Sequence, residues 1–257
     1  MDELAVARAV ATPIGLSGGR FYFAPSTVAR AQQLGLDPLH LYYLGRGGVL
    51  GDATAAVVAS AFGFINPDLV ERMWAIGRQV LTPPQAATEY FECSAAVGRL
   101  HFGGLDLDNF CRLAEGIVAR TNPAGMPLFA GIAALPRVAD PPGRAMQLLT
   151  VLRELRGAAH LICLLALGIE PRVAHYVRRP DYLAAFGWAE ADIAMPASSI
   201  HTHLDKAEAW TDRLVAPAFG GVPPQERAAF VSTVETLYQL LGAAAPVHRP
   251  DPADLEA

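Results

Sequence analysis

The sequence predicts an all-α protein in which two related helical units, in a pseudo-twofold arrangement, flank a middle helical segment. Apolar residues recur at helical spacing between prolines and glycines that mark helix ends. No run of alternating β-branched residues is long enough to form a sheet. A stretch near the start of the chain also recurs near its end. With 257 residues, of which 52% are hydrophobic and 18% charged, the chain has enough apolar material for a core, which excludes a wholly disordered protein.

Proline and glycine mark the helices of the first unit. A proline in the first turn and a glycine directly after the last turn are typical of helix boundaries, and each predicted helix here has at least one of the two. The predicted helices are Ser26–Leu34, Asp37–Gly45, Ala53–Phe62 and Pro67–Leu81. Asp52 is expected to cap the third of them. Upstream, Gly19–Phe23 is predicted to be a short extended piece.

The rest of the chain is also predicted to be helical, up to a loose tail. The predicted helices are Pro84–Val97, Leu107–Arg120, Gly143–Leu167, Ser198–Ala216 and Pro224–Leu241. Gly157 is expected to interrupt the longest of them. We therefore divide the chain into residues 1–82 for the first helical unit, 83–157 for the middle segment, 158–242 for the second unit and 243–257 for a loose tail rich in proline, alanine and aspartate.

An internal repeat underlies the prediction of two related units. Residues 54–67 align without gaps on residues 211–224, with Thr, Val, Ala, Phe, Gly and Pro at matching places. Upstream, a Phe/Tyr, a Pro and a Gly also recur at nearly the same separation. The shared pattern is a helix, a glycine stop and a next helix that starts at proline, whereas chance similarity between two alanine-rich helices is the alternative. In a duplicated scaffold of this kind, we expect a ligand site between the halves.

Charge and cysteine content narrow the partners and the compartment. The net charge of −5 and the pI near 5.8 argue against a broad nucleic-acid-binding surface. The three cysteines form no CxxC pair, so neither a disulfide framework nor a zinc knuckle is predicted. The acidic start Met1-Asp2-Glu3 is unlike a signal peptide, and the longest apolar run, Ala158–Ile169, is too short to span a bilayer. We therefore expect a soluble, cytoplasmic protein with no membrane partner.

The predicted helix Ser198–Ala216 carries a polar stripe that is a candidate for chemistry. His201, Asp205, Glu208 and Asp212 follow one another at spacings of 4, 3 and 4 residues, which places them at the flank of the apolar face. We assign Glu208 and Asp212 as general base or orienting carboxylates and His201 to ligand binding. One helix supplies too few converging ligands for a metal, so no metal site is predicted, and no motif identifies a cofactor. A solvated helix face is the alternative.

Arginines and a second histidine lie in apolar or glycine-rich surroundings. Arg156 and His160 share one helix face if the helix continues through Gly157, and they form a candidate pocket for an anion or carboxylate. A hydrogen-bonded core histidine is the alternative. Arg46 stands in the stretch Gly45–Gly51, which lacks the Gly-Lys-Ser/Thr ending of a phosphate loop and is predicted to be a turn that presents this arginine. We assign Arg46 and Arg156 to ligand binding and His160 to catalysis.

Asp212 allows a more specific prediction. In the repeat it takes the place of Ala55, so only the second half carries a carboxylate there. A buried carboxylate without a partner is strongly unfavourable. We therefore predict that Asp212 is partly buried, faces the cleft between the halves and accepts a hydrogen bond from an arginine, either Arg156 or Arg46.

Several short motifs, distributed over both halves, occur together in one known family. They are Phe21–Pro25, Leu34–Leu36, Gly45–Gly51, Phe62–Pro67, Leu152–His160 and Glu208–Asp212. In these motifs the chain resembles the SalK-like helix-turn-helix family of actinobacteria, over nearly its whole length. The resemblance implies helix-turn-helix-like units and, because some members sit near natural-product genes, a role in specialised metabolism. The helix-turn-helix label implies a fold more than DNA binding.

The chain departs from the family pattern at several places. The family segment usually reads Arg-Glu-His-Arg-Gly-Asp-Gly-His, whereas Leu155, Ala158 and Ala159 here replace its first His, its Asp and its second Gly. In the first half, Arg-Ala-Ala-Pro-Leu-Gly is replaced by Arg-Gly-Gly-Val-Leu-Gly over residues 46–51. A family pocket that needs the first His and the Asp is therefore lost here or has a different chemistry.

Three functions from different classes remain open. The leading hypothesis is a small-molecule-binding protein or enzyme of actinobacterial specialised metabolism, in which Arg46, Arg156 and His160 orient an anionic or carbonyl-bearing ligand in a pocket between the halves. The second is a helix-turn-helix DNA-binding regulator, against which stand the acidic balance and the lack of a basic recognition helix. The third is a non-catalytic homodimer, because alanine-rich helices pack closely and a second copy would cover apolar surface.

Overall fold

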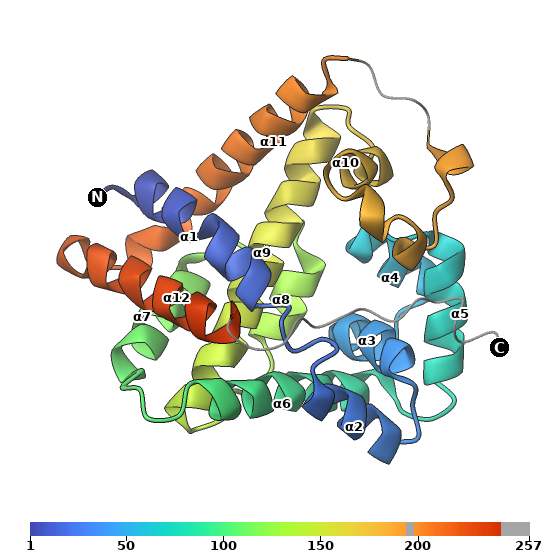
Figure 1. The fold of residues 1–257 in the computed structure, drawn as a ribbon, viewed down its shortest axis with the longest axis horizontal. Helices are drawn as coiled ribbons and strands as arrows, with labels where there is room; N and C mark the ends of the chain where they lie inside the picture. Colours follow the sequence, from blue (N-terminus) through green and yellow to red (C-terminus); the bar gives the residue numbers. More distant parts are fainter. Residues whose placement is uncertain (194–197, 243–257) are drawn as a thin grey trace.

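The structure, a computed structural model, describes residues 1–193 and 198–242. Within these residues the chain is all-α, with α-helices joined by turns and short 3₁₀ helices and no strand. The longest helix, α9, runs through the middle of the molecule, and the other helices pack around it (Figure 1). The predicted fold class is therefore confirmed at the level of an all-α protein. The predicted loose tail from residue 243 onward lies outside the described residues.

Within the described ranges, short connections join the elements. The α-helices are α1 Glu3–Ser17, α2 Pro25–Gln33, α3 Pro38–Gly47, α4 Ala55–Phe62, α5 Pro67–Gly77, α6 Pro83–His101, α7 Asp108–Arg120, α8 Pro127–Ala133, α9 Pro141–Ala166, α10 Pro171–Arg178, α11 Ile200–Val215 and α12 Arg227–Gly242. The 3₁₀ helices are η1 Gly48–Leu50, η2 Pro180–Tyr182, η3 Ala184–Phe186, η4 Glu190–Asp192, η5 Ala216–Gly221 and η6 Pro224–Glu226.

Each predicted helix has a counterpart, but three helices are missing from the prediction. The sequence gives no clear boundary for α1, which contains Pro13 in its interior and begins where the Asp2 side chain accepts a hydrogen bond from the Ala5 N–H at 2.7 Å. The helices α8 and α10 span only two turns, which is too short for apolar periodicity to appear. Gly157 does not interrupt α9, which continues through it.

The prediction of an extended piece over Gly19–Phe23 is wrong. These residues form successive turns, in which the Tyr22 N–H donates to the Gly19 carbonyl at 3.1 Å and the Ala24 N–H donates to the Phe21 carbonyl at 3.1 Å. A side chain on Gly18 would lie 2.5 Å from the Leu149 carbonyl oxygen, so the turn begins with the backbone pressed against α9. The turns bury Phe21 and Tyr22 beside α9 instead of pairing them with a strand.

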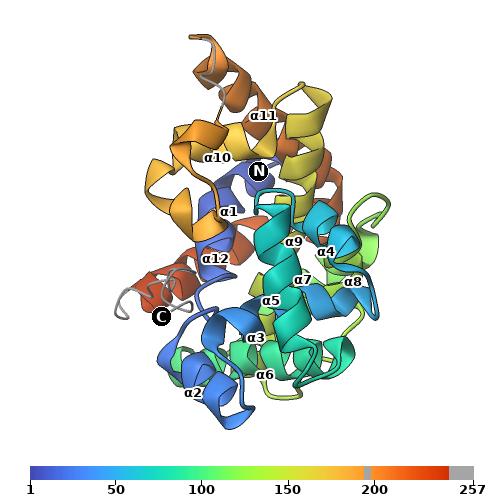
Figure 2. The same cartoon turned by 90° about the vertical axis from the view of Figure 1, so that its right-hand side faces the viewer.

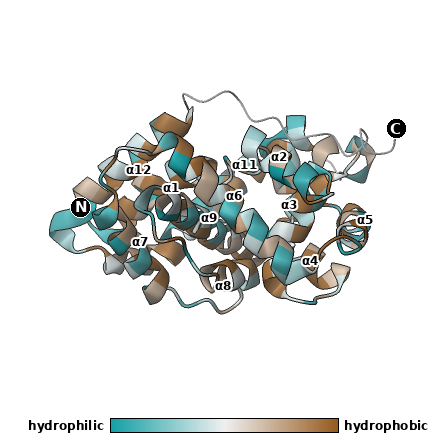
Figure 3. Cartoon of the chain, turned by 90° about the horizontal axis from the view of Figure 1, so that it is seen from below, coloured by the Kyte–Doolittle hydropathy of each residue, from teal (hydrophilic) through white to brown (hydrophobic). Residues whose placement is uncertain are grey.

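The hydrophobic core is continuous across the predicted segments. One cluster contains buried side chains from the first, middle and last parts of the chain, including Phe21, Tyr43, Phe102, Phe129 and Phe230. A second, small cluster joins the end of α9 to α10 and α11. Its buried members are Leu164, Ile169, Ala174, Leu204 and Ala207. Seen from below, many helices carry both hydrophilic and hydrophobic residues, as amphipathic helices around a common core do (Figure 3).

The aligned stretches of the internal repeat do not share one local structure. Thr54 is the N-cap of α4, whereas Thr211 is fully buried in the middle of α11. Gly63 ends α4 with a φ of +73°, whereas Gly220 lies inside the 3₁₀ helix η5. The structure therefore does not show the internal duplication. The boundary predicted between residues 157 and 158 also falls inside α9.

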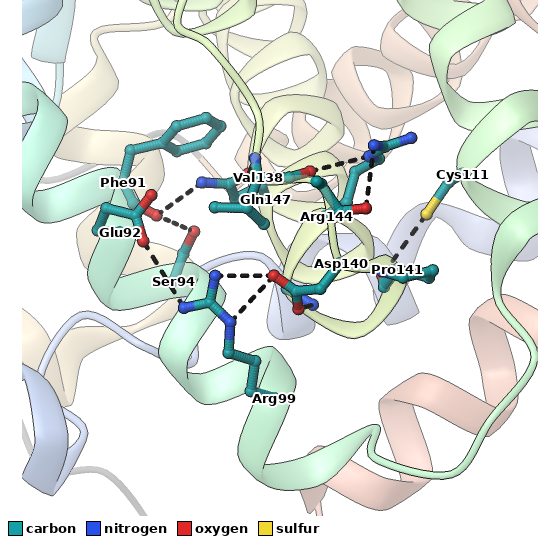
Figure 4. A network of polar contacts seen from close by, with 12 residues as sticks. Phe91, Glu92, Ser94, Arg99, Cys111, Val138, Asp140, Pro141, Arg144 and Gln147 are labelled. Carbon is teal, nitrogen blue, oxygen red and sulfur yellow. Dashed lines mark hydrogen bonds and ion pairs between the residues drawn. The ribbon is translucent and has the colours of Figure 1, made fainter.

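Polar contacts to α6 hold the start of α9 (Figure 4). Arg99 donates two hydrogen bonds to Asp140 Oδ2, at 3.0 and 2.8 Å, and Asp140 Oδ1 accepts from the Gly143 N–H in the first turn of α9. The hydrogen bonds from Arg99 lower the pKa of Asp140. The buried Gln147 side chain donates to the Phe91 carbonyl at 3.2 Å. These contacts fix the helix that carries Arg153, Glu154, Arg156 and His160.

No helix within residues 1–193 and 198–242 combines the length and apolar character needed to cross a bilayer.

Candidate functional site

A cavity of about 580 Å³ lies where α4, α9, α10 and α11 meet. Both cartoon views place α10 and α11 beside the C-terminal part of α9 (Figures 1 and 2). Aromatic and aliphatic side chains form much of its wall, among them Phe62, Phe64, Phe186, Leu161 and Leu165. Polar side chains from α3, α9 and α11 reach the same cavity, which is the usual composition of a site for a small organic ligand.

The Glu154 carboxylate is a deeply buried polar group of this cavity, with a side chain only 4% exposed. Arg46 binds it with two hydrogen bonds, from Nε to Oε1 at 2.9 Å and from Nη2 to Oε2 at 3.0 Å. The Tyr22 hydroxyl donates to Oε1 at 3.0 Å, and Arg153 Nη1 donates to the same oxygen at 2.9 Å. Arg46 Nη1 is also within 3.3 Å of the Tyr42 hydroxyl. We call Tyr22, Tyr42, Arg46, Arg153 and Glu154 the Glu154 cluster.

The electrostatics of the Glu154 cluster keep the carboxylate charged. Burial by itself would raise the pKa of Glu154, but the positive charges of Arg46 and Arg153 and the hydrogen bonds to it lower the pKa to about 2. Burial raises the pKa of Tyr22, so its phenol stays neutral. The cluster therefore holds two guanidinium cations and one carboxylate at neutral pH.

Aromatic rings support both arginines of the cluster. The Arg46 guanidinium carbon lies 4.7 Å from the centre of the Phe62 ring on α4. The Arg153 guanidinium carbon lies 4.9 Å from the centre of the Tyr22 ring. Such stacking fixes the planes of the guanidinium groups and stabilises their charge in a site with little water. Both arginines are thus held in place before any ligand binds.

His160 lies one turn beyond Arg156 on α9 and presents a ring nitrogen near the cavity. The Thr211 hydroxyl donates to the Ala207 carbonyl at 2.8 Å, so it can only accept from His160 Nδ1, 3.0 Å away. In the neutral imidazole the proton is therefore on Nδ1, and Nε2 has a free lone pair 3.7 Å from Glu208 Oε1. Burial lowers the pKa of His160, partly opposed by Glu208. His160 can thus accept a proton or hydrogen bond through Nε2 at neutral pH.

Arg156 joins α9 to the acidic stripe of α11. Its Nη1 donates to Asp212 Oδ1 at 2.8 Å and its Nη2 donates to Glu208 Oε2 at 2.7 Å. The Asp212 side chain is 13% exposed, and Arg8 lies 3.8 Å from its other oxygen. The predicted partial burial of Asp212 and its hydrogen bond from Arg156 are therefore confirmed. Asp212 lies behind Arg156 and does not itself line the cavity.

The sequence-predicted residues fall into two groups. Arg46, Arg156, His160 and Glu208 line the one cavity, although they come from three separate helices. His201 and Asp212 do not line it, so the prediction that Asp212 faces the cleft is wrong: His201 is exposed in the first turn of α11, and Asp212 is held by Arg156 outside the cavity wall.

Sequence reasoning missed the centre of the site. Glu154, Arg153 and Tyr22 were not assigned to it. The available signal was a carboxylate among apolar neighbours. Val151 and Ala158 lie one turn before and one turn after Glu154 on the same helix face. Such a residue is buried only when a partner neutralises it, and the partner lies far away in the sequence.

Comparison with known proteins places the chain in a family. A model of a helix-turn-helix family matches residues 7–247. The chain belongs to this helix-turn-helix family. Searches of curated proteins and of solved structures gave no significant match. Family membership thus covers the whole candidate site, including the Glu154 cluster, His160 and Glu208.

Proposed function

We propose that this chain binds a small organic molecule in the cavity between α4, α9, α10 and α11, as a binding protein or an enzyme. The observation that carries the proposal is the convergence of Arg46, Glu154, His160 and Glu208 on one mostly apolar cavity of about 580 Å³. Buried ionic groups are costly, and a purely structural core could be filled with apolar side chains instead. Their retention around a hollow space favours a ligand.

His160 supplies the chemistry that this cavity could use. Its Nε2 lone pair is available at neutral pH, and Glu208 stands 3.7 Å away to stabilise a proton that it gains. A ligand hydroxyl or an acidic C–H near Nε2 would be the proton donor. If the protein is an enzyme, proton transfer by His160 is therefore the step we expect, with Arg46 and Arg156 as ligand-orienting residues.

The resemblance to the SalK-like actinobacterial family supports a role in specialised metabolism and two related helical units. In the segment that usually reads Arg-Glu-His-Arg-Gly-Asp-Gly-His, residues Arg153, Glu154, Arg156, Gly157 and His160 are retained. All five line the cavity. The retained part of the pattern therefore coincides with the proposed ligand site.

The test is binding of a neutral fluorescent probe, N-phenyl-1-naphthylamine, with a variant that fills the cavity. Ala61→Trp places an indole on the cavity wall in α4, whereas Ala56→Trp makes the same change at an exposed position of that helix. We expect saturable binding to the wild type and to Ala56→Trp, and about tenfold weaker binding to Ala61→Trp. No saturable binding, or equal binding by both variants, would contradict the proposal.

DNA binding is a second candidate function, favoured by membership in a helix-turn-helix family. The short helix pairs α2–α3 and α4–α5 are the elements that a helix-turn-helix reader would use. However, α3 turns its single arginine, Arg46, inward to Glu154, so this helix offers little positive charge to phosphate. Salt-dependent binding of random duplex DNA at low ionic strength would support this function, and its absence would exclude it.

A further inference from the structure

We propose that the ligand of the cavity is a monocarboxylate with an apolar or aromatic body, and that Arg153 receives its carboxylate. This inference rests on the proposed function and specifies the ligand class of that same cavity. It follows from the charge of the Glu154 cluster, from the hydrogen-bond capacity left on each arginine and from the composition of the wall.

The Glu154 cluster holds one more cation than anion. Arg46 and Arg153 both donate to Glu154, and neither forms an ion pair with another carboxylate among the described residues. Tyr22 and Tyr90 remain neutral because burial raises the pKa of each phenol. A net positive charge in a partly dry site is unfavourable unless an anion accompanies it. One bound carboxylate would neutralise the cluster.

Most of the spare hydrogen-bond donors of the two arginines belong to Arg153. Arg46 uses Nε, Nη1 and Nη2 toward Glu154 and Tyr42, and its side chain is 14% exposed. Arg153 uses only Nη1, and its side chain is twice as exposed, at 28%. A guanidinium carries five N–H groups, so Arg153 can still donate to a further acceptor. Because Arg153 lines the cavity and is fixed against Tyr22, an incoming carboxylate meets a prepared donor.

The wall also contains Arg156, Arg178 and His160, which do not compete for this carboxylate. Arg178 is already paired with Asp205. Arg156 already donates to Asp212 and Glu208, so two acidic groups offset its charge. The half-exposed Glu208 also repels an anion from the α11 side of the cavity. His160 is uncharged at neutral pH because burial lowers its pKa. The charge distribution therefore directs the carboxylate of the ligand toward α3 and the middle of α9.

The remaining wall fits an apolar body. Phe62, Phe64 and Phe186 line the cavity together with Leu161 and Ile162. An aromatic acid would thus place its ring among these side chains and its carboxylate at Arg153. A single unbalanced cation matches a monoanion better than a phosphate monoester, which carries nearly two negative charges at neutral pH.

The experiment is displacement of bound N-phenyl-1-naphthylamine by three compounds that share a naphthalene body. These are 1-naphthylacetate, the neutral 1-naphthylacetamide and 1-naphthyl phosphate. We expect 1-naphthylacetate to displace the probe at a concentration about tenfold or more below that of the amide, because a hydrogen bond to a charged group is worth more than a neutral one. In Arg153→Met this preference should disappear, whereas the exposed Arg213→Met, an equal change of charge, should retain it.

The outcomes separate this inference from the proposed function. If the probe binds but acetate and amide displace it equally from the wild type, the monocarboxylate assignment is wrong while the cavity remains a ligand site. If phosphate competes best, the ligand is a dianion, and the assignment is equally wrong. If the preference for acetate survives in Arg153→Met, another residue receives the carboxylate. Arg153→Gln provides a second variant, and the wild-type comparison alone decides the ligand class even if both variants unfold.

Discussion

Glu154 should contribute strongly to stability, because it is the carboxylate that pairs with two arginines largely withdrawn from water. Glu154→Gln would leave both guanidinium groups without a counter-ion and should lower the free energy of unfolding by about 3–5 kcal/mol. Arg153→Met, in contrast, leaves Arg46 and Glu154 as a neutral pair and should change the stability by less than about 1 kcal/mol. Urea unfolding of the two variants checks this difference. A large loss in Arg153→Met would show that the second cation is structural.

The same carboxylate should make stability depend on pH in the acid range. The pKa of Glu154 is lowered from 4.5 to about 2 by its two arginine partners, which act against burial. Its contribution is therefore complete above pH 4.5 and is lost as the pH falls toward 2, since the unfolded chain then binds a proton that the folded protein does not. We expect the stability gap between wild type and Glu154→Gln to narrow by about 3 kcal/mol from pH 5 to pH 2. A gap that stays constant over this range would contradict the lowered pKa.

Asp212 and Glu208 both bind Arg156, but they should contribute differently to the free energy of unfolding. The Asp212 side chain is 13% exposed and that of Glu208 is 49% exposed. Asp212→Asn should therefore destabilise the fold by about 1–3 kcal/mol, and Glu208→Gln by less than about 1 kcal/mol. Thermal or urea unfolding measures both. Equal losses of stability would mean that burial of the two carboxylates does not determine how much each contributes to stability.

At the residue scale, the sequence predicts contacts that follow from spacing within one helix, and it does not predict contacts between residues far apart in the chain. The spacing of Arg156 and His160 on one helix, and of Glu208 and Asp212 on another, could be read from the chain, and these residues do meet. The bond between Arg46 and Glu154 spans 108 positions, and no local pattern predicts it. His201 shares the helical spacing of Asp205, Glu208 and Asp212, but it lies too near the start of α11 to reach the cavity.

Among the elements, α6 and α9 each contain a glycine, and substitution of the two should have opposite effects on stability. A side chain on Gly157 would meet nothing within 4 Å, whereas one on Gly98 of α6 would lie 2.3 Å from the Pro142 carbonyl oxygen at the start of α9. Gly157→Ala should thus raise stability by about 0.5–1 kcal/mol through helix propensity, and Gly98→Ala should lower it by more than about 1 kcal/mol through backbone overlap. Unfolding curves of both variants check the signs. A destabilising Gly157→Ala would indicate that α9 bends there.

Element boundaries were predictable where the chain uses proline and glycine. Proline opens α2, α3 and α5, and a left-handed glycine with a φ of +73° ends α4. The short helices α8 and α10 also start at proline, but with two turns each they depend on tertiary packing rather than on periodicity. The stretch after Thr211 does not repeat the structure of α4. In the first stretch a helix begins directly after Thr54, whereas Thr211 already lies inside α11, which starts at Ile200 and packs against α9.

At the scale of the whole molecule, the cavity is lined by residues from two hydrophobic clusters of different size. Among the described residues, the large cluster joins α1 to α9 with α12, and the small cluster around Leu164 and Ala174 holds α10 and the neighbouring turn of α11. The segment after α10 adds a few polar contacts to the loop after α4. The Trp188 indole donates to the Phe64 carbonyl at 2.8 Å, and Asn66 donates to the Gly187 carbonyl at 2.8 Å. One wall of the cavity is thus attached more weakly than the others.

The weaker attachment of α10 predicts where a bound ligand slows local opening of the chain. Segments with few buried contacts open at a lower free energy than the core, so the amides of α10 should exchange with deuterium faster than those of α6. Saturation with N-phenyl-1-naphthylamine at 100 times its Kd adds about 2.7 kcal/mol to any opening that destroys the site. Exchange in α10 should then slow by about 100-fold, while exchange in the first turn of α6, which lines no part of the cavity, should not change beyond the effect on global unfolding. Mass spectrometry of peptides from Pro171–Arg178 and from the start of α6 measures both. Unchanged exchange in α10 at saturation would mean that the probe binds elsewhere or that this wall does not open.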